Sequence, residues 1–218
     1  IPLLHWLYAG NVADSVQFRS VTEELATHYG ELAQSCEHIT LVFDKGNNSQ
    51  EAFDTLAATP FHFVGSLVPS QHADLLAVPR RRFRAASNPR LGGVEVYRTE
   101  KRVFGRRHTV VVTFNQNLLA GQMQGLTANL NKARRKLREL QQQLRRWREG
   151  KVKGGKKPTL AGVQNQVRSI CSAQHLKSIL KTEVKEVRRA LELSFSTDQA
   201  ALDRLCRVQL GKTLLFTD

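Results

Sequence analysis

The chain has 218 residues, of which 41% are hydrophobic, and its formal net charge is +14. This length suits one large domain or a core that carries a substantial insertion. Neither a secretory signal nor an apolar run near the roughly 20 residues of a membrane helix is present, which argues against a membrane or exported protein.

The charge is distributed unevenly along the chain. Residues 1–79 carry two cations and nine acids, whereas residues 80–157 carry 22 cations and four acids. A basic block of this kind attracts polyanions by counterion release, without sequence preference and with strong salt dependence. We expect a nucleic-acid partner; the alternative is an ordinary solvated surface.

The three cysteines, Cys36, Cys171 and Cys206, are far apart in the sequence. Their odd number and wide spacing match neither a disulfide framework nor a paired zinc motif. We therefore expect reduced structural thiols in a reducing cytoplasm and no cysteine enzyme.

The first 78 residues alternate strand and helix patterns. Apolar spacing and turn residues predict, in order, a strand over Leu3–Tyr8, a helix from Asp14 to Gly30, a strand over His38–Phe43, a helix opened by Ser49, and a strand over Phe61–Leu67. This β-α-β-α-β order is typical of an α/β sheet with helices on its faces. Alternation within the last strand assigns Phe61 and Phe63 to the core rather than to base stacking.

The pattern breaks at "VPRRRFRAASNPRLGG", where five arginines, two prolines and two glycines indicate a boundary near residue 79. The following stretch, "GVEVYRTEKRVFGRRHTVVVTF", predicts two strands around a turn at Gly105. At the end of the chain, residues 190–196 read as a strand, a short helix contains Leu202 and Leu205, and Thr213–Thr217 reads as a last strand.

The most regular pattern is a seven-residue repeat of apolar positions. It runs through Leu126, Leu130, Ala133, Leu137, Leu140, Leu144 and Trp147. Such a stripe needs a partner, and residues 159–187 are expected to supply a second helix after the flexible, cationic tract 150–158. The economical interpretation is an antiparallel helical hairpin.

Lys and Arg residues occupy many of the other positions of this predicted hairpin. We expect them to contact nucleic-acid phosphates, because their excess over acids exceeds what solubility alone requires. The candidate nucleic-acid-binding residues are Lys132, Arg134, Arg135, Lys136, Arg138, Arg145, Arg146, Arg148, Lys151, Lys153, Lys156 and Lys157.

Asp44 is the leading candidate for chemistry. It follows a predicted buried strand, and functional groups of α/β sheets gather at the carboxyl ends of strands. The alternative is a turn former, since Asp commonly caps nearby N–H groups in turns. His72 lies in a predicted loop and is a weaker candidate for substrate contact.

Four segments together resemble insertion-sequence transposases of the DDE type. They are "GNVAD" (10–14), "LVFDKGNNS" (41–49), "FHFVGSLVPSQH" (61–72) and the closing "GKTLLFTD" (211–218). The resemblance implies an α/β fold in which a partial ribonuclease H-like core (1–78) is interrupted by a basic insertion (79–207) with strands and a helical hairpin. Residues 208–218 would then return to the core as a strand.

The resemblance also implies a function. Asp44 corresponds to the second acid of a catalytic triad that binds Mg²⁺ or Mn²⁺ and cuts and joins DNA. The first Asp of that family precedes the segment matched here and the Glu follows it, so the chain resembles a fragment lacking both ends and is expected to be inactive alone. The implied partners are transposon-end and target DNA and a second protomer in a synaptic complex, without a membrane or a small-molecule substrate. The implied setting is a prokaryotic cytoplasm, at the nucleoid.

A rival interpretation belongs to another class. In it, the chain is a non-catalytic nucleic-acid-binding coiled-coil protein, and Asp44 only forms a turn. Extending the reading frame in both directions separates the two, because only a transposase requires the other two acids.

Overall fold

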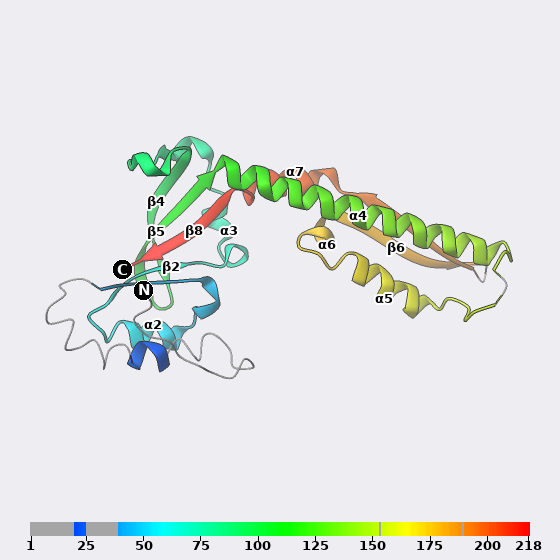
Figure 1. Cartoon of the computed structure of the whole chain (residues 1–218), viewed down its shortest axis with the longest axis horizontal. Coiled ribbons are helices and arrows are strands. Elements are labelled where there is room, and N and C mark those ends of the chain that lie inside the picture. The colour runs from blue at the N-terminus through cyan, green and yellow to red at the C-terminus, as the bar shows by residue number, and fades with distance from the viewer. Residues whose placement is uncertain (1–19, 25–38, 153, 189) are drawn as a thin grey trace. The chain divides into compact units, whose positions relative to one another are not determined.

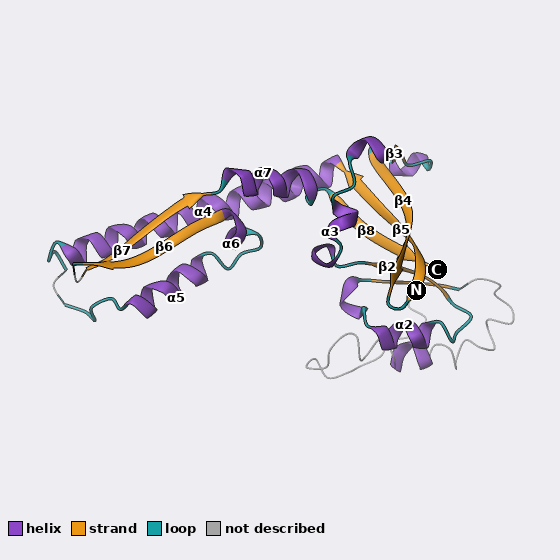
Figure 2. Cartoon of the chain, turned by 180° about the vertical axis from the view of Figure 1, so that it is seen from behind, coloured by secondary structure: helices purple, strands orange, loops and turns teal. Residues whose placement is uncertain are grey.

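The computed structural model describes residues 20–24, 39–152, 154–188 and 190–218 (Figure 1). The chain forms two compact units, one comprising residues 1–115 and 212–218 and the other residues 116–211. The expected mixed α/β class is confirmed: the elements are a six-stranded mixed sheet, one long helix, a two-stranded hairpin and shorter helices (Figure 2).

The first unit is built on the six-stranded sheet. Its strands lie in the order β1 (Thr40–Phe43), β2 (His62–Ser66), β8 (Lys212–Thr217), β5 (Arg106–Asn115), β4 (Val94–Val103) and β3 (Arg84–Ala85). Strands β1 and β2 are parallel, while every other neighbouring pair is antiparallel. Because β1 and β2 are parallel, their carboxyl ends lie at the same edge of the sheet.

One face of this sheet carries an aromatic core. Phe63 on β2 and Phe216 on β8 meet edge to face with their ring centroids 5.2 Å apart. Helix α2 (Gln50–Leu56) places Phe53 against both rings, and the side chains of Phe53 and Phe216 are almost fully buried. Gly65 of β2 is required here, because an added Cβ would lie 2.7 Å from the rings of Phe43 and Phe216.

Short elements connect the strands of this unit. They are the single-turn 3₁₀ helices η1 (Lys45–Asn47), η2 (Pro69–Gln71), η3 (Arg80–Arg82) and η4 (Pro89–Leu91), and the four-residue helix α3 (Ala73–Leu76). Residues 20–24 are helical, within the helix expected from Asp14. The strand expected over Leu3–Tyr8 and most of that helix lie outside the described residues.

The second unit is organised by helix α4 (Gln116–Arg148). Its heptad stripe is confirmed, since six of the seven positions are buried and Trp147 is half-buried. The stripe shares a core with helices α5 (Leu160–Ile170) and α6 (Leu176–Ile179) and with the hairpin of β6 (Leu180–Val187) and β7 (Ala190–Thr197). Helix α7 (Gln199–Val208) completes the unit.

The partner of the stripe differs from the expected helical hairpin. A second helix over residues 159–187 is wrong beyond Ile170, because residues 180–187 form strand β6, paired with β7. The physical reason is the period-two alternation of apolar Leu180 and Val184 with charged Lys181 and Lys185, which suits a half-buried strand. Helix α4 therefore packs on both a helix and a β-hairpin, and it begins at Gln116, ten residues before the stripe.

The two units meet in the sequence at residues 115/116 and 211/212, whereas the sequence predicts boundaries near residues 79 and 208. Strand β5 pairs with β8 over six residues, from Thr109 opposite Thr217 to Phe114 opposite Lys212. This long-range pairing joins β4 and β5 to the sheet of β1 and β2. The strands around Gly105 are confirmed, but they belong to the compact unit of the first 78 residues and not to that of helix α4.

Candidate functional site

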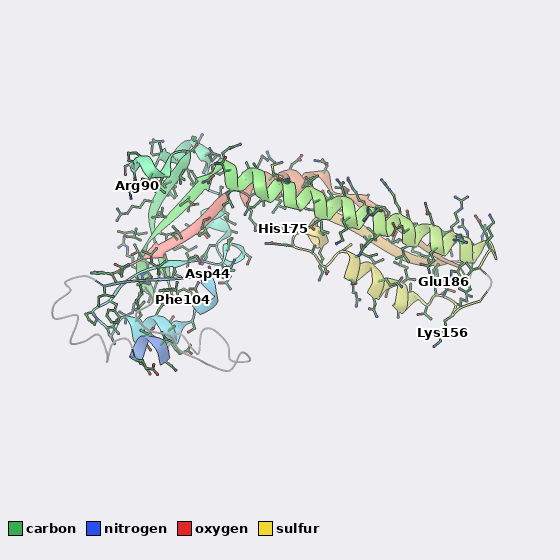
Figure 3. The ribbon with its side chains drawn as sticks, viewed as in Figure 1. Asp44, Arg90, Phe104, Lys156, His175 and Glu186 are labelled. Carbon is green, nitrogen blue, oxygen red and sulfur yellow. The ribbon has the colours of Figure 1, made fainter. Side chains whose placement is uncertain are left out.

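Asp44 lies at the carboxyl edge of the parallel strand pair. It directly follows β1, and Ser66 is the last residue of the neighbouring β2. The Asp44 side chain is exposed (Figure 3). The fold thus provides the strand-end placement that the sequence predicted for Asp44.

Two hydrogen bonds orient the Asp44 carboxylate. Its Oδ1 atom accepts from the Ser66 hydroxyl and from the Lys45 backbone N–H, each at 2.7 Å. These bonds favour the ionised form, so they hold the pKa of Asp44 below its ordinary value, with the Ser66 bond as the larger cause. Among the described residues, none donates to Oδ2.

Asp44 is also a capping residue. Its extended backbone and its bond to the Lys45 amide make it the N-cap of η1. The cap uses only Oδ1, so the other carboxylate oxygen, Oδ2, takes no part in it.

Asn48 and Ser49 follow Asp44 in the chain, near the same carboxyl edge of β1 and β2. The Asn48 amide donates from Nδ2 to the Ser66 carbonyl at 2.9 Å, and its Oδ1 is buried without a hydrogen-bond partner in the described part of the chain. Ser49 caps α2 by accepting from the Ala52 amide at 3.1 Å. Side-chain oxygens, the kind of ligand that Mg²⁺ and Mn²⁺ prefer, therefore cluster near the ends of β1 and β2.

This donor set fits one side of a magnesium or manganese site. Both ions prefer carboxylate, carbonyl and water oxygens, and Mg²⁺ keeps several waters. Asp44 offers one exposed carboxylate oxygen for that purpose. Within the described ranges, however, no three His, Cys, Asp or Glu side chains come together as a metal-binding group.

His72 belongs to a different group of side chains. It is half-buried between η2 and α3, next to Asp74, which pairs with Lys101 at 2.6 Å. Burial lowers the pKa of His72, and the positive charge of Lys101 adds to this effect. These surroundings favour the neutral form of His72, whose Nδ1 is buried without a hydrogen-bond partner in the described part of the chain.

Sequence reasoning missed a contact of Asp218. The carboxylate lies 2.5 Å from Nδ1 of His62 and also accepts from the Phe63 amide at 3.3 Å. Partial burial acts to raise the pKa of Asp218, but these hydrogen bonds outweigh it and the pKa is lowered. Only the register of β2 against β8 reveals this pair, and no local signal in the sequence could have done so.

The candidate DNA-binding cations on α4 fall into two sets. Several are engaged: Arg134 donates to the Thr197 hydroxyl, and Arg135, Arg145 and Arg148 pair with Glu139, Glu149 and Glu192. Lys151 also pairs with Glu149. For Lys132, Lys136, Arg138, Arg146, Lys156 and Lys157 no described carboxylate lies within 4.0 Å, and Lys153 lies outside the described residues.

Helix geometry gathers part of these cations on one side. At about 100° per residue, Lys132, Arg135, Lys136 and Arg146 fall within a sector about 100° wide, which borders the buried stripe on one side. All four side chains are exposed. With a rise of about 1.5 Å per residue, they span about 21 Å of helix. We call these four residues the α4 cationic stripe.

Four further arginines were read in the sequence only as part of a boundary or a strand. Arg81, Arg82, Arg84 and Arg98 line one shallow depression in the first unit, together with Val96 and Tyr97. Their grouping depends on the pairing of β3 with β4, which sequence spacing alone does not predict.

Within the described residues, no helix combines the length and the apolar character that crossing a membrane requires. No protein-family model, no curated protein and no solved structure matches this chain.

Proposed function

We propose that this chain is part of a DNA transposase of the DDE type, in which Asp44 is one of the acids that bind the catalytic metal ions. The observation that carries the proposal is the placement of Asp44, an exposed carboxylate at the shared carboxyl edge of two parallel strands. The sequence motifs around Asp44 support the same assignment.

Asp44 and its neighbours have defined roles in this proposal. Asp44 would bind Mg²⁺ or Mn²⁺, which stabilises the attacking and leaving oxygens of a phosphodiester exchange when it is bound. Ser66 fixes the carboxylate through its 2.7 Å hydrogen bond to Oδ1, and the Asp44 side chain stays exposed to solvent. We assign no role to Lys45.

The basic surface supports DNA as the partner. The α4 cationic stripe presents four exposed cations over about 21 Å, comparable with six steps of 3.4 Å along one DNA strand. Contacts of this kind hold the phosphate backbone and carry no sequence information. Transposon ends and target DNA, bound by a pair of protomers, are the proposed ligands, in a prokaryotic cytoplasm.

A second candidate is a non-catalytic nucleic-acid-binding protein. It is favoured by the N-cap role of Asp44 in η1, which gives this side chain a structural purpose. It is also favoured because, among the described residues, no group of three acids or other metal ligands gathers around Asp44, and two metal ions need more ligands than one acid supplies.

The test uses the protein encoded by the complete reading frame, with transposon-end DNA and Mg²⁺. Asp44→Asn is expected to reduce strand transfer about a thousandfold, because metal-based charge stabilisation contributes several kcal/mol. DNA affinity should stay within about threefold. Strand transfer that survives Asp44→Asn would contradict the assignment of Asp44 as a metal ligand. DNA binding without any strand transfer by the unaltered protein would favour the second candidate.

A further inference from the structure

We propose that Arg81, Arg82, Arg84 and Arg98 form a DNA phosphate-binding groove in the first unit, separate from the α4 cationic stripe. This inference rests on the proposed function, since it identifies another surface for the same partner. We call these four residues the arginine groove.

The groove is a defined surface feature. A depression of about 610 Å³ is lined by the four arginines and by Val96 and Tyr97 of β4. Arg81 and Arg82 come from η3, Arg84 from β3 and Arg98 from β4. Three separate elements thus converge on one site.

The pairing of β3 with β4 sets the spacing of two of these arginines. Arg84 lies opposite Val96, and Arg98 is two residues further along β4, on the same face as Val96. Diagonal neighbours of this kind are about 7–8 Å apart. The two side chains therefore start close together on the same face of the sheet edge, which suits contact of both guanidinium groups with phosphates of one DNA strand.

Contacts within the protein hold two of the four arginines, Arg82 and Arg84, in place before any ligand binds. Arg84 donates from Nη1 to the carbonyls of Arg81 and Phe83 at 3.0 and 3.1 Å. The Arg82 guanidinium lies 4.7 Å from the centroid of the Tyr97 ring, within cation–π range. A prearranged group loses less conformational entropy on binding.

The segment itself is anchored next to the groove. Arg80 forms a two-point ion pair with Glu95, at 3.0 and 2.6 Å, and lies over the Phe114 ring. Phe83 is buried and lies 6.0 Å from Tyr97, measured between ring centroids. Arg80 and Phe83 therefore fix the backbone that carries the groove arginines and are not themselves part of the site.

The groove carries concentrated positive charge. Among the described residues, no carboxylate pairs within 4.0 Å with any of its four arginines, although Arg80 and Arg107 nearby in sequence do have acidic partners. Four like charges in one depression repel one another, and a polyanion removes that repulsion. Arginine recognises phosphate through planar, two-point hydrogen bonds, which favours a nucleic-acid backbone over a diffuse acidic surface.

The experiment measures affinity for a 20-base-pair DNA duplex at several salt concentrations, with the 218-residue chain. The variant R81A/R82A/R84A/R98A is expected to bind at least tenfold more weakly at 100 mM salt. The slope of log affinity against log salt should become less steep by about 3, close to one per lost phosphate contact.

The matched control removes the same charge from the same unit. R90A/R102A/R106A/R107A alters four exposed arginines outside the groove and should change affinity less than threefold (Arg90 is labelled in Figure 3). The milder R81A/R98A variant spares the contacts of Arg82 and Arg84 and should still flatten the slope by about 1.5. Circular dichroism confirms that each variant is folded.

The outcomes separate this inference from the proposed function. Equal losses in the groove and control variants, or unchanged affinity in both groove variants, would overturn the arginine groove. If the unaltered chain binds DNA and only α4 variants weaken it, the groove is wrong while the proposed function stands. If the unaltered chain does not bind the duplex, the proposed function fails with it.

Discussion

The Asp44 carboxylate accepts a 2.7 Å hydrogen bond from the Ser66 hydroxyl, and this bond joins the carboxyl ends of two parallel strands. Ser66 thereby orients an ionised oxygen at the edge of the sheet. Asp44 is simultaneously the N-cap of η1, so one side chain combines a structural role with the proposed chemical role.

Removing the Ser66 hydroxyl should change the ionisation of Asp44. We expect Ser66→Ala to raise the pKa of the Asp44 carboxyl, because the Ser66 hydrogen bond is the largest cause of its lowering. Carboxyl-carbon NMR over pH 2–6 measures this. Ser70→Ala, at an exposed serine in η2, is the control and should leave the Asp44 titration in place. An unchanged titration in Ser66→Ala would show that the hydroxyl does not hold the carboxylate.

Gly65→Ala should destabilise the first unit. The new methyl group would lie 2.7 Å from the rings of Phe43 and Phe216, and overpacking of this kind costs about 1–3 kcal/mol. Hydrogen exchange of the β2 and β8 amides reports the loss. Gly121→Ala is the matched control in α4, where nothing lies within 4 Å of the added atom, and it should stabilise the second unit by up to about 1 kcal/mol. Unchanged protection in Gly65→Ala would contradict the packing described for β2.

The α4 cations should differ in what they do. The variant K132A/R135A/K136A/R146A is expected to weaken duplex binding at least tenfold and to flatten its salt dependence by about 3 to 4, without loss of stability. Arg134→Ala should instead lower the stability of the second unit, because Arg134 donates to Thr197 of β7 at 2.6 Å. Fluorescence anisotropy and thermal unfolding measure the two effects. These assignments would be reversed if Arg134→Ala weakened DNA binding while the quadruple variant left DNA affinity unchanged.

His108 should make the first unit less stable in acid. The ring is 6% exposed and lies edge to face with Phe63 and Phe216, with centroids 5.5 Å apart in each pair. Burial lowers the pKa of His108, against the opposing effects of the Thr217 backbone and the Asp218 charge. The free energy of unfolding is therefore greatest above the unfolded-state pKa of about 6.5 and falls as the pH drops below it.

The measurement is hydrogen exchange of the Val110 and Phe216 amides between pH 5 and 8, corrected for intrinsic rates. His108→Leu should remove the decline below pH 6.5. His175→Asn, at a left-handed residue in the other unit that Asn tolerates, should preserve it. If the free energy of unfolding of His108→Leu declined equally below pH 6.5, another titrating group would be responsible for the decline.

Local patterns predicted much of the secondary structure. The sequence predicts a strand over 61–67, where Phe61 and Phe63 alternate with His62 and Val64, and the structure has β2 there. The heptad stripe of α4 follows from its spacing. Strand β6 differs from the predicted helix because Lys181, Glu183 and Lys185 alternate with Leu180, Thr182 and Val184 and lie on the exposed face of a hairpin. Residues 171–187 contain no glycine or proline that would end a helix, so only the packing against β7 and α4 decides their state.

Long-range pairing limited the prediction of the site. The position of Asp44 after a strand is visible in the sequence, since the apolar run ends there and turn residues follow. The arginine groove and the His62–Asp218 pair are not visible, because each depends on which strands become neighbours and in what register. Neither local propensity nor residue spacing contains that information.

Binding of Mn²⁺ at Asp44 tests the central claim most directly. In an NMR titration with Mn²⁺, the amide signals of Lys45, Ser66 and Asn48 should broaden before those near other exposed acids such as Asp54 and Asp203. The isosteric Asp44→Asn variant should abolish this preference, because an amide is a much weaker ligand than a carboxylate. Broadening that is evenly distributed over the acidic residues, or that persists in Asp44→Asn, would contradict the assignment of Asp44 as a metal ligand.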